Sequence, residues 1–263
     1  MILKRKIYKK LLEWKNECQG KKALLIEGAR RIGKSTICEE FGKNEYESYL
    51  LIDFAKKDKE VEMYFERYLN DLDTFFMLLQ THFGTKLTER NSLIIFDEVQ
   101  MFPQARAAIK YLVADGRYDY IETGSLISIR ENVKNIVIPS EERNINMYPL
   151  DFEEFAIALE EDLLVEYIKK CFEKREPLER SMHNQAMLLF HQYMLVGGMP
   201  MPVVSFIESK KDFTEADKEK RDILKLYRED IMKIDMRYRS KVLAIYDQIP
   251  GFLSQHEKRV VFK

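Results

Sequence analysis

The stretch ALLIEGARRIGKSTICEEF, residues 23–41, carries the strongest local pattern of this chain. An apolar run leads into Gly28, four residues separate Gly28 from Gly33, and Lys34 and Ser35 follow directly. The spacing G-x-x-x-x-G-K-[ST], placed between a strand and a helix, is typical of a phosphate-binding loop. We therefore predict a strand that ends before Gly28, an anion-binding loop, and a helix that begins near Lys34.

The residue types of this loop suit a nucleoside triphosphate. Glycines lack a Cβ atom, so backbone N–H groups can close around an anion. The Lys34 ammonium can reach the β- and γ-phosphates, the Ser35 hydroxyl can bind Mg²⁺, and the positive end of the helix over residues 34–41 adds to the attraction. The residues expected to contact the nucleotide are Gly28, Ala29, Arg30, Arg31, Ile32, Gly33, Lys34, Ser35 and Thr36.

A second apolar segment, SLIIFDEVQ at residues 92–100, contains two adjacent acids. Asp97 follows the apolar run, at the strand end where ligands bind in open α/β sheets. There it can hold Mg²⁺ beside Ser35, and Glu98 can orient or deprotonate a water molecule for attack on the γ-phosphate. The two acids could instead cap a helix. The phosphate loop earlier in the chain favours the magnesium interpretation.

Hydroxyl and arginine side chains follow the neighbouring segments. Thr123 and Ser125 come at the end of an apolar run, where a hydroxyl could sense the γ-phosphate or hold the attacking water; an ordinary glycine-containing turn is an alternative. Arginines could stabilise the charge of a phosphoryl-transfer transition state, although a surface salt bridge is favoured for each of them. The arginines concerned are Arg30, Arg31, Arg130 and Arg143.

The first half of the chain alternates between strand and helix patterns, which predicts an α/β fold with a parallel sheet covered on both faces. The expected strands are residues 23–27, 49–54, 92–100, 118–123 and 145–148. From about Pro149 onward the pattern is helical. This predicts a core domain over residues 1–149 and a helical lid over residues 150–235.

Composition limits the class of protein. Of the 263 residues 46% are hydrophobic, enough for a full core, and the net charge of −1 gives no general sign of nucleic-acid or membrane binding. No apolar run approaches the ~18 residues of a membrane span. Three widely spaced cysteines indicate reduced thiols and a cytoplasmic location. The basic N-terminus predicts an amphipathic helix, or alternatively a membrane-surface helix. The residues expected to face the protein are Ile7, Leu11, Leu12 and Trp14.

Five motifs occur in a fixed order: EGARRIGKST, LIIFDEVQ, ETGSL, YPLDFEEFA and VGGMP. In this combination the chain resembles the AAA-type P-loop ATPases of bacteria and archaea. It is similar to their STAND-related, origin-recognition-like branch, whose C-terminal part is a domain of unknown function. The likeness covers about residues 1–263. It implies ATP and Mg²⁺ as ligands and a P-loop three-layer sandwich with parallel strand order 5-1-4-3-2.

The resemblance also assigns roles by position. Lys34 and Ser35 resemble the Walker A pair, and Arg30 resembles an arginine common in this loop. The expected catalytic residues are Glu98, Lys34 and Ser125, of which Ser125 resembles a sensor-1 residue, and the expected metal ligands are Ser35 and Asp97. No sensor-2 arginine stands out among Arg221, Arg228 and Arg237. Residues 236–263 resemble the start of an incomplete winged helix, and Lys258 and Arg259 are its basic residues for duplex DNA.

Two hypotheses share this site. The first is a Mg²⁺-dependent ATPase that acts as a nucleotide-driven switch; the alternative is a slowly hydrolysing adaptor that recruits DNA or protein through its C-terminal part. A small-molecule kinase is disfavoured because Glu98 suits water activation. A GTPase is disfavoured because the string MKID at residues 232–235 lacks the asparagine of N-K-x-D. We expect no membrane partner, and the oligomeric state stays open.

Overall fold

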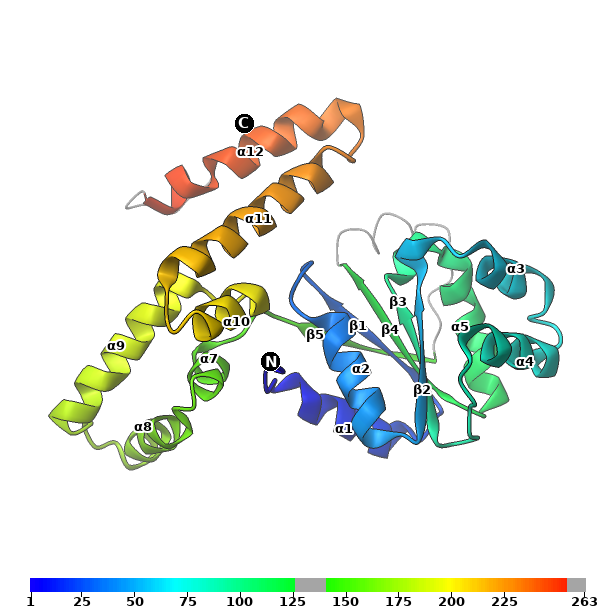
Figure 1. Cartoon of the computed structure of the whole chain (residues 1–263), viewed down its shortest axis with the longest axis horizontal. Helices are drawn as coiled ribbons and strands as arrows, with labels where there is room; N and C mark the ends of the chain where they lie inside the picture. The colour runs from blue at the N-terminus through cyan, green and yellow to red at the C-terminus, as the bar shows by residue number, and fades with distance from the viewer. Residues whose placement is uncertain (126–140, 255–263) are drawn as a thin grey trace. The chain divides into compact units, whose positions relative to one another are not determined.

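The computed structural model describes residues 1–125 and 141–254 (Figure 1). The chain divides into two compact units, Met1–Pro200 and Met201–Lys263, and each is described by itself. The domain boundaries expected after residues 149 and 235 stay predictions. The division between the two compact units lies at Pro200, inside a helix.

The first unit contains a five-stranded sheet in which neighbouring strands run parallel, in the order β2-β3-β4-β1-β5. Read from its other edge, the order is β5-β1-β4-β3-β2. The strands are β1 (Ala23–Gly28), β2 (Ser48–Asp53), β3 (Ser92–Asp97), β4 (Asp119–Ser125) and β5 (Glu142–Met147). The parallel sheet with its helices confirms the predicted α/β class. One strand was predicted too long: β3 ends at Asp97 instead of Gln100, because Glu98 has a left-handed backbone with φ +53°.

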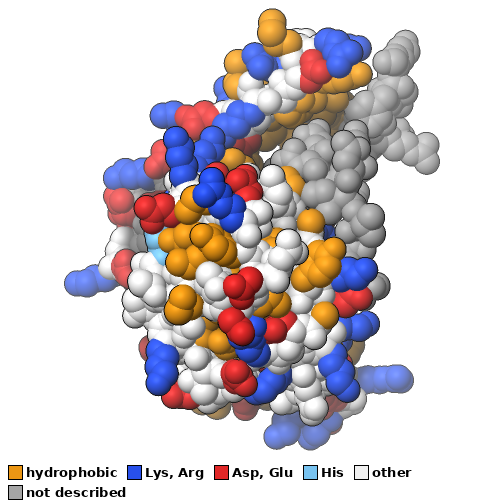
Figure 2. All heavy atoms as spheres, turned by 90° about the vertical axis from the view of Figure 1, so that its right-hand side faces the viewer, with side chains coloured by type: hydrophobic (Ala, Val, Ile, Leu, Met, Phe, Trp, Pro, Cys, Tyr) orange, Lys and Arg blue, Asp and Glu red, His pale blue; other side chains and the backbone are white. Residues whose placement is uncertain are grey.

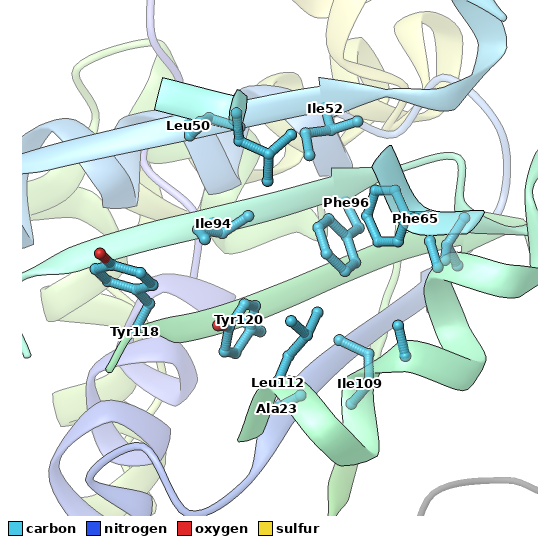
Figure 3. Packing of buried hydrophobic residues seen from close by; sticks show 14 of the residues in the cluster. Ala23, Leu50, Ile52, Phe65, Ile94, Phe96, Ile109, Leu112, Tyr118 and Tyr120 are labelled. Carbon is cyan, nitrogen blue, oxygen red and sulfur yellow. The ribbon is translucent and has the colours of Figure 1, made fainter. Parts of the chain in front are cut away.

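Both faces of the sheet are buried along its central strands β1, β3 and β4, as expected for a parallel sheet. Successive side chains of a strand point to opposite faces, so β1 contributes Leu24 and Ile26 to one hydrophobic cluster and Ala23 and Leu25 to the other. Figure 3 shows the second cluster, in which side chains from four strands meet those of α3 and α5. This cluster is rich in aromatic rings; Phe96, for example, makes an edge-to-face contact with Phe65.

Helices pack on each face of the sheet. α1 (Ile7–Cys18) and α2 (Lys34–Glu45) contribute to the cluster around Leu24, and the cluster around Leu25 takes residues from α3 (Lys59–Arg67), α4 (Leu72–Phe83) and α5 (Pro103–Asp115). Two short 3-10 helices, η1 (Phe54–Lys56) and η2 (Val99–Met101), follow β2 and β3. The amphipathic N-terminal helix was predicted correctly: three of its four expected inward residues are buried, and Leu12 is half-buried.

After β5 the described part of the chain forms helices joined by short loops and contains no further strand. α7 (Phe152–Ala158), α8 (Asp162–Lys174) and α9 (Arg180–Val196) belong to the first unit, and α10 (Pro200–Glu208) leads into the second. The second unit contains α11 (Phe213–Ile231) and α12 (Met236–Ser254). Because residues 255–263 lie outside the described part, the winged-helix interpretation of residues 236–263 stays a prediction.

Figure 2 views the molecule from the side of α3, α4 and α5, and shows hydrophobic side chains among charges of both signs. Met77 of α4 and Tyr111 of α5 are each more than half exposed. Within the two described segments, no single helix has the length and apolar content to cross a membrane. α9 and α10 reach that length and apolar content only when they are taken together, and a bend of 120° lies between them.

Candidate phosphate-binding site

The phosphate loop lies at the carboxyl end of β1. Gly28 is paired in register with Ser125 of β4 and Met147 of β5, so the loop leaves the sheet where two neighbouring strands also end. A Cβ atom at Gly28 would lie 2.4 Å from the Met147 carbonyl oxygen, which explains the need for glycine here. At the other end of the loop Gly33 has φ +89°, a left-handed conformation that favours glycine.

No side chain caps the N-terminus of α2, which directly follows the loop. Directly before α3, α4, α7 and α11 lies an aspartate whose carboxylate accepts backbone N–H hydrogen bonds from the first turn of the helix. The residue before α2 is Gly33, which has no capping side chain, and the first turn of α2 contains no acid. The first N–H groups of a helix need an acceptor, and the helix dipole favours an anion there. This helix end therefore suits a phosphate group.

Lys34 is buried beneath the loop. Its Nζ atom donates to the carbonyl oxygens of Ala29, at 2.9 Å, and Gly28, at 3.3 Å. Burial lowers the pKa of Lys34 below its ordinary value, and the nearby carboxylates of Glu98 and Asp97 oppose this effect. The ammonium group thus lies between the loop and the two acids, where an added negative charge would favour its protonated form.

Ser35 and Asp97 meet although 62 residues separate them in the chain. The Ser35 hydroxyl lies 2.8 Å from both carboxylate oxygens of Asp97, which is buried. Thr123 donates a second hydroxyl hydrogen bond to Asp97 Oδ1, from the end of β4. The sheet order brings these groups together, because β4 lies between β1 and β3. The result is a carboxylate held by two hydroxyl groups beside the start of α2.

Glu98 follows Asp97 with a left-handed backbone, which is uncommon for a residue with a side chain. Its N–H donates to Thr123 Oγ1 at 3.3 Å, and its carboxylate accepts a hydrogen bond from Gln100 Nε2. Glu98 is half-buried, whereas Gln100 is buried. Glu98 is therefore partly exposed, and its carboxylate is held by a buried amide.

The oxygen atoms of Ser35 and Asp97 are the ligands that Mg²⁺ prefers, since this ion binds one or two protein oxygens together with phosphates and water. Among residues 1–125 and 141–254 there is no group of three His, Cys, Asp or Glu side chains that could hold a metal by itself. The donor set therefore fits a magnesium ion that is shared with a phosphate ligand.

The other predicted residues take different positions. Ser125 lies beside Gly28 in the sheet register, while Arg31 and Thr36 are exposed at the loop. Arg143 forms an ion pair with Glu17, and three arginines of the second unit pair with aspartates of that unit. These three are Arg221, Arg228 and Arg237. The predicted residues that lie outside the described part of the chain are Arg130, Lys258 and Arg259.

Two polar residues at the site received too little weight from the sequence. Thr123 was considered only as one of two hydroxyl candidates, although its side chain contacts Asp97 directly. Gln100 was read as the end of a strand, although it holds Glu98. The sequence does place an amide side chain two residues after Glu98, close enough in the chain to donate to its carboxylate. The contact of Thr123 with Asp97 could be predicted only from the register of β4 against β3, which the sequence does not give.

The fold and the loop define a P-loop-like α/β protein. A family model described as an AAA domain matches residues 20–156, more than half of the chain, so this protein belongs to the AAA domain family. The predicted AAA-type assignment is therefore confirmed, while its narrower branch stays a prediction. The solved structure of C. elegans PCH-2 is similar over 83% of this chain and 69% of that chain, with a TM-score of 0.42 and 10% sequence identity. No curated protein matches the sequence.

Proposed function

We propose that this protein binds ATP with Mg²⁺ and hydrolyses it to ADP and phosphate, as a nucleotide-driven switch. The observation that carries the proposal is the contact of Ser35 with Asp97 at 2.8 Å, directly after the uncapped start of α2. The start of α2, the Lys34 ammonium group and the oxygen atoms of Ser35 and Asp97 thus lie together at the carboxyl end of the sheet, where they could bind a phosphate and Mg²⁺. Membership of the AAA domain family supports ATP as the nucleotide.

Each residue of the site has a defined task in this proposal. The loop amides and Lys34 bind the phosphates, and Ser35 and Asp97 hold the metal. Bound Mg²⁺ neutralises charge that develops on the phosphate oxygens. Glu98 orients a water molecule and accepts its proton as the water oxygen attacks the γ-phosphorus. The bond from that phosphorus to the bridging oxygen breaks, and ADP leaves.

The test separates binding from hydrolysis. Calorimetry measures ATP–Mg²⁺ binding, and steady-state phosphate release measures turnover. We expect Lys34→Ala to abolish binding. We expect Glu98→Gln to bind ATP normally and to lose at least about 10²-fold in turnover, the usual contribution of a general base. Wild-type turnover of Glu98→Gln would show that the assigned base is wrong, and folded wild-type protein that gives no heat with ATP–Mg²⁺ would refute the proposal.

Asp53 offers a matched control for the acids. It is the register partner of Asp97 at the end of the neighbouring strand β2, and its side chain accepts a hydrogen bond from the Ala55 N–H at 3.0 Å. Asp53→Asn removes a carboxylate at the same sheet edge and is expected to leave turnover unchanged. Tight binding combined with a kcat far below about 1 s⁻¹ would favour the slowly hydrolysing adaptor over the switch.

A further inference from the structure

The side chain of Arg5 connects the phosphate loop to two later segments of the first unit. Its Nη1 atom donates to the carbonyl oxygen of Ile32, inside the loop, at 3.0 Å. Its Nη2 atom donates to the carbonyl oxygen of Tyr148, just after β5, at 2.6 Å. Its Nε atom lies 3.3 Å from Glu154 Oε1, in α7, and both of these side chains are more than nine-tenths buried. One guanidinium group thus holds three segments.

Glu154, the partner of Arg5, is itself fixed by the backbone. Its Oε1 atom accepts the Lys6 N–H at 2.6 Å, and its Oε2 atom accepts the Asp151 N–H at 3.2 Å. The Asp151 carboxylate in turn accepts a hydrogen bond from the Glu154 N–H at 2.9 Å, and the two bonds together form the capping box of α7. The sequence YPLDFEEFA therefore supplies a rigid carboxylate for Arg5 at the start of a helix.

The loop residue that Arg5 holds lies between two residues with left-handed backbones. Ile32 is flanked by Arg31 with φ +69° and Gly33 with φ +89°. A left-handed residue other than glycine is strained and persists only where its surroundings enforce that conformation. The Arg5 hydrogen bond to Ile32 and the complete burial of the Ile32 side chain provide such enforcement.

The motif VGGMP contributes a second support from the same side. The Gly198 carbonyl accepts the Leu150 N–H at 2.7 Å, and the side chain of Pro200 approaches the loop, 3.7 Å from where a Cβ atom of Gly33 would lie. The segments after β5 and after α9 thus meet next to the loop. This placement gives both motifs a physical role that their sequence alone did not indicate.

From these contacts we infer that Arg5 is a positioning residue that holds the phosphate loop in its anion-binding conformation and couples it to α7 through Glu154. The inference rests on the proposed ATP-binding function. Arg5 acts through the backbone of Ile32, because its guanidinium nitrogens are engaged by Ile32, Tyr148 and Glu154. Its loss therefore changes the direction of the loop amides, which a bound phosphate would report as weaker affinity.

The primary test compares Arg5→Gln, Arg5→Lys and wild type. We expect the KM for ATP to rise roughly tenfold in Arg5→Gln, the effect of one charge-assisted hydrogen bond, with a much smaller change in kcat. Arg5→Lys should not restore the wild-type KM, because a single ammonium cannot replace a planar fork that donates to two carbonyl groups and lies beside a carboxylate. A wild-type KM in Arg5→Lys would show that the contacts of the guanidinium group with three segments are not needed, and would overturn the inference.

Arg117→Gln is the matched control. Arg117 also links separate segments, since it pairs with Asp115 at 2.8 Å and with Asp73 at 2.7 Å, and it makes no contact with the loop among the described interactions. We expect this variant to melt at a lower temperature with an unchanged KM. An equal rise of KM in Arg117→Gln and Arg5→Gln would show that general destabilisation explains the effect, and would overturn the inference.

Hydrogen exchange makes the test independent of ATP. We expect the amides of residues 29–33 to exchange faster in folded Arg5→Gln than in wild type, with unchanged protection of β1 and β3. This result would support the positioning role even if the wild-type protein bound no ATP, in which case only the proposed function would fail. Unchanged hydrogen exchange of the loop amides together with an unchanged KM in Arg5→Gln would refute the positioning role of Arg5. Glu154→Gln keeps a capping side chain, so it should give a smaller shift in the same direction.

Discussion

The contact between Thr123 and Asp97 leads to the sharpest prediction for the site. Thr123 is completely buried; its hydroxyl donates to Asp97 Oδ1 and accepts the Glu98 N–H at 3.3 Å. Thr123→Val keeps the shape of the side chain and removes both bonds. Asp97 then keeps only Ser35 as a hydroxyl donor among the described contacts, and the Glu98 N–H loses its acceptor.

The expected effects follow from these two bonds. A hydrogen bond to a charged group contributes about 1.5–3 kcal/mol, and a polar group left unsatisfied adds to the loss, so we expect the free energy of unfolding to fall by about 2–4 kcal/mol. Because Asp97 also becomes less well positioned for Mg²⁺, turnover at limiting Mg²⁺ should fall at least about tenfold, the equivalent of roughly 1.4 kcal/mol. Urea denaturation measures the first effect, and phosphate release against Mg²⁺ concentration measures the second.

Thr123→Ser serves as the control, because it keeps the hydroxyl and loses one buried methyl group. It should lower stability by about 1 kcal/mol and leave the Mg²⁺ dependence unchanged. Wild-type stability and wild-type Mg²⁺ dependence in Thr123→Val would refute the reasoning. A Thr123→Ser variant as impaired as Thr123→Val would assign the effect to packing.

Two further predictions concern the structure around the site. Burial, together with the neighbouring carboxylate of Glu142, raises the pKa of Glu122 well above its ordinary value, so its contribution to stability is full below about pH 4.3 and declines as the pH rises toward the raised pKa. Glu122→Gln should therefore gain unfolding free energy relative to wild type as the pH rises from 4 to 8, and equal pH profiles of the two proteins would contradict this. Gly198→Ala would place a Cβ atom 2.1 Å from the Leu150 carbonyl oxygen, and we expect a loss of about 1–3 kcal/mol in urea denaturation. The control is Gly251→Ala, where nothing lies within 4 Å; an equal loss there would exclude the clash as the cause.

The parts of the site that follow one another in the chain were predictable. The loop, its lysine and the start of α2 occupy consecutive residues, so their spacing alone predicts a strand, a loop between two glycines and a helix from Lys34, as the structure has them. The end of β3 was misjudged because Val99 continues the apolar run. Its side chain is buried in η2, after the backbone has turned at Glu98, and hydrophobicity cannot distinguish the two situations.

The contacts between distant segments were not predictable from local patterns. Thr123 and Ser125 have the same parity along β4, so only the stagger against β3, set by Leu93 opposite Asp119, determines which hydroxyl reaches Asp97. Arg5 shows the same limit more strongly. It contacts a carbonyl group 27 residues away and another 143 residues away, and no spacing rule relates such positions.

The position of α1 has a practical consequence for producing the protein. The family match begins at residue 20, yet Leu11 and Trp14 are almost completely buried before that point, and the Trp14 ring lies 6.4 Å from that of Phe41. A recombinant chain begun at residue 20 would leave Phe41 and its neighbours facing water and would invite aggregation. Expression trials that trim the protein to its family boundary should therefore retain everything from Arg5 onward.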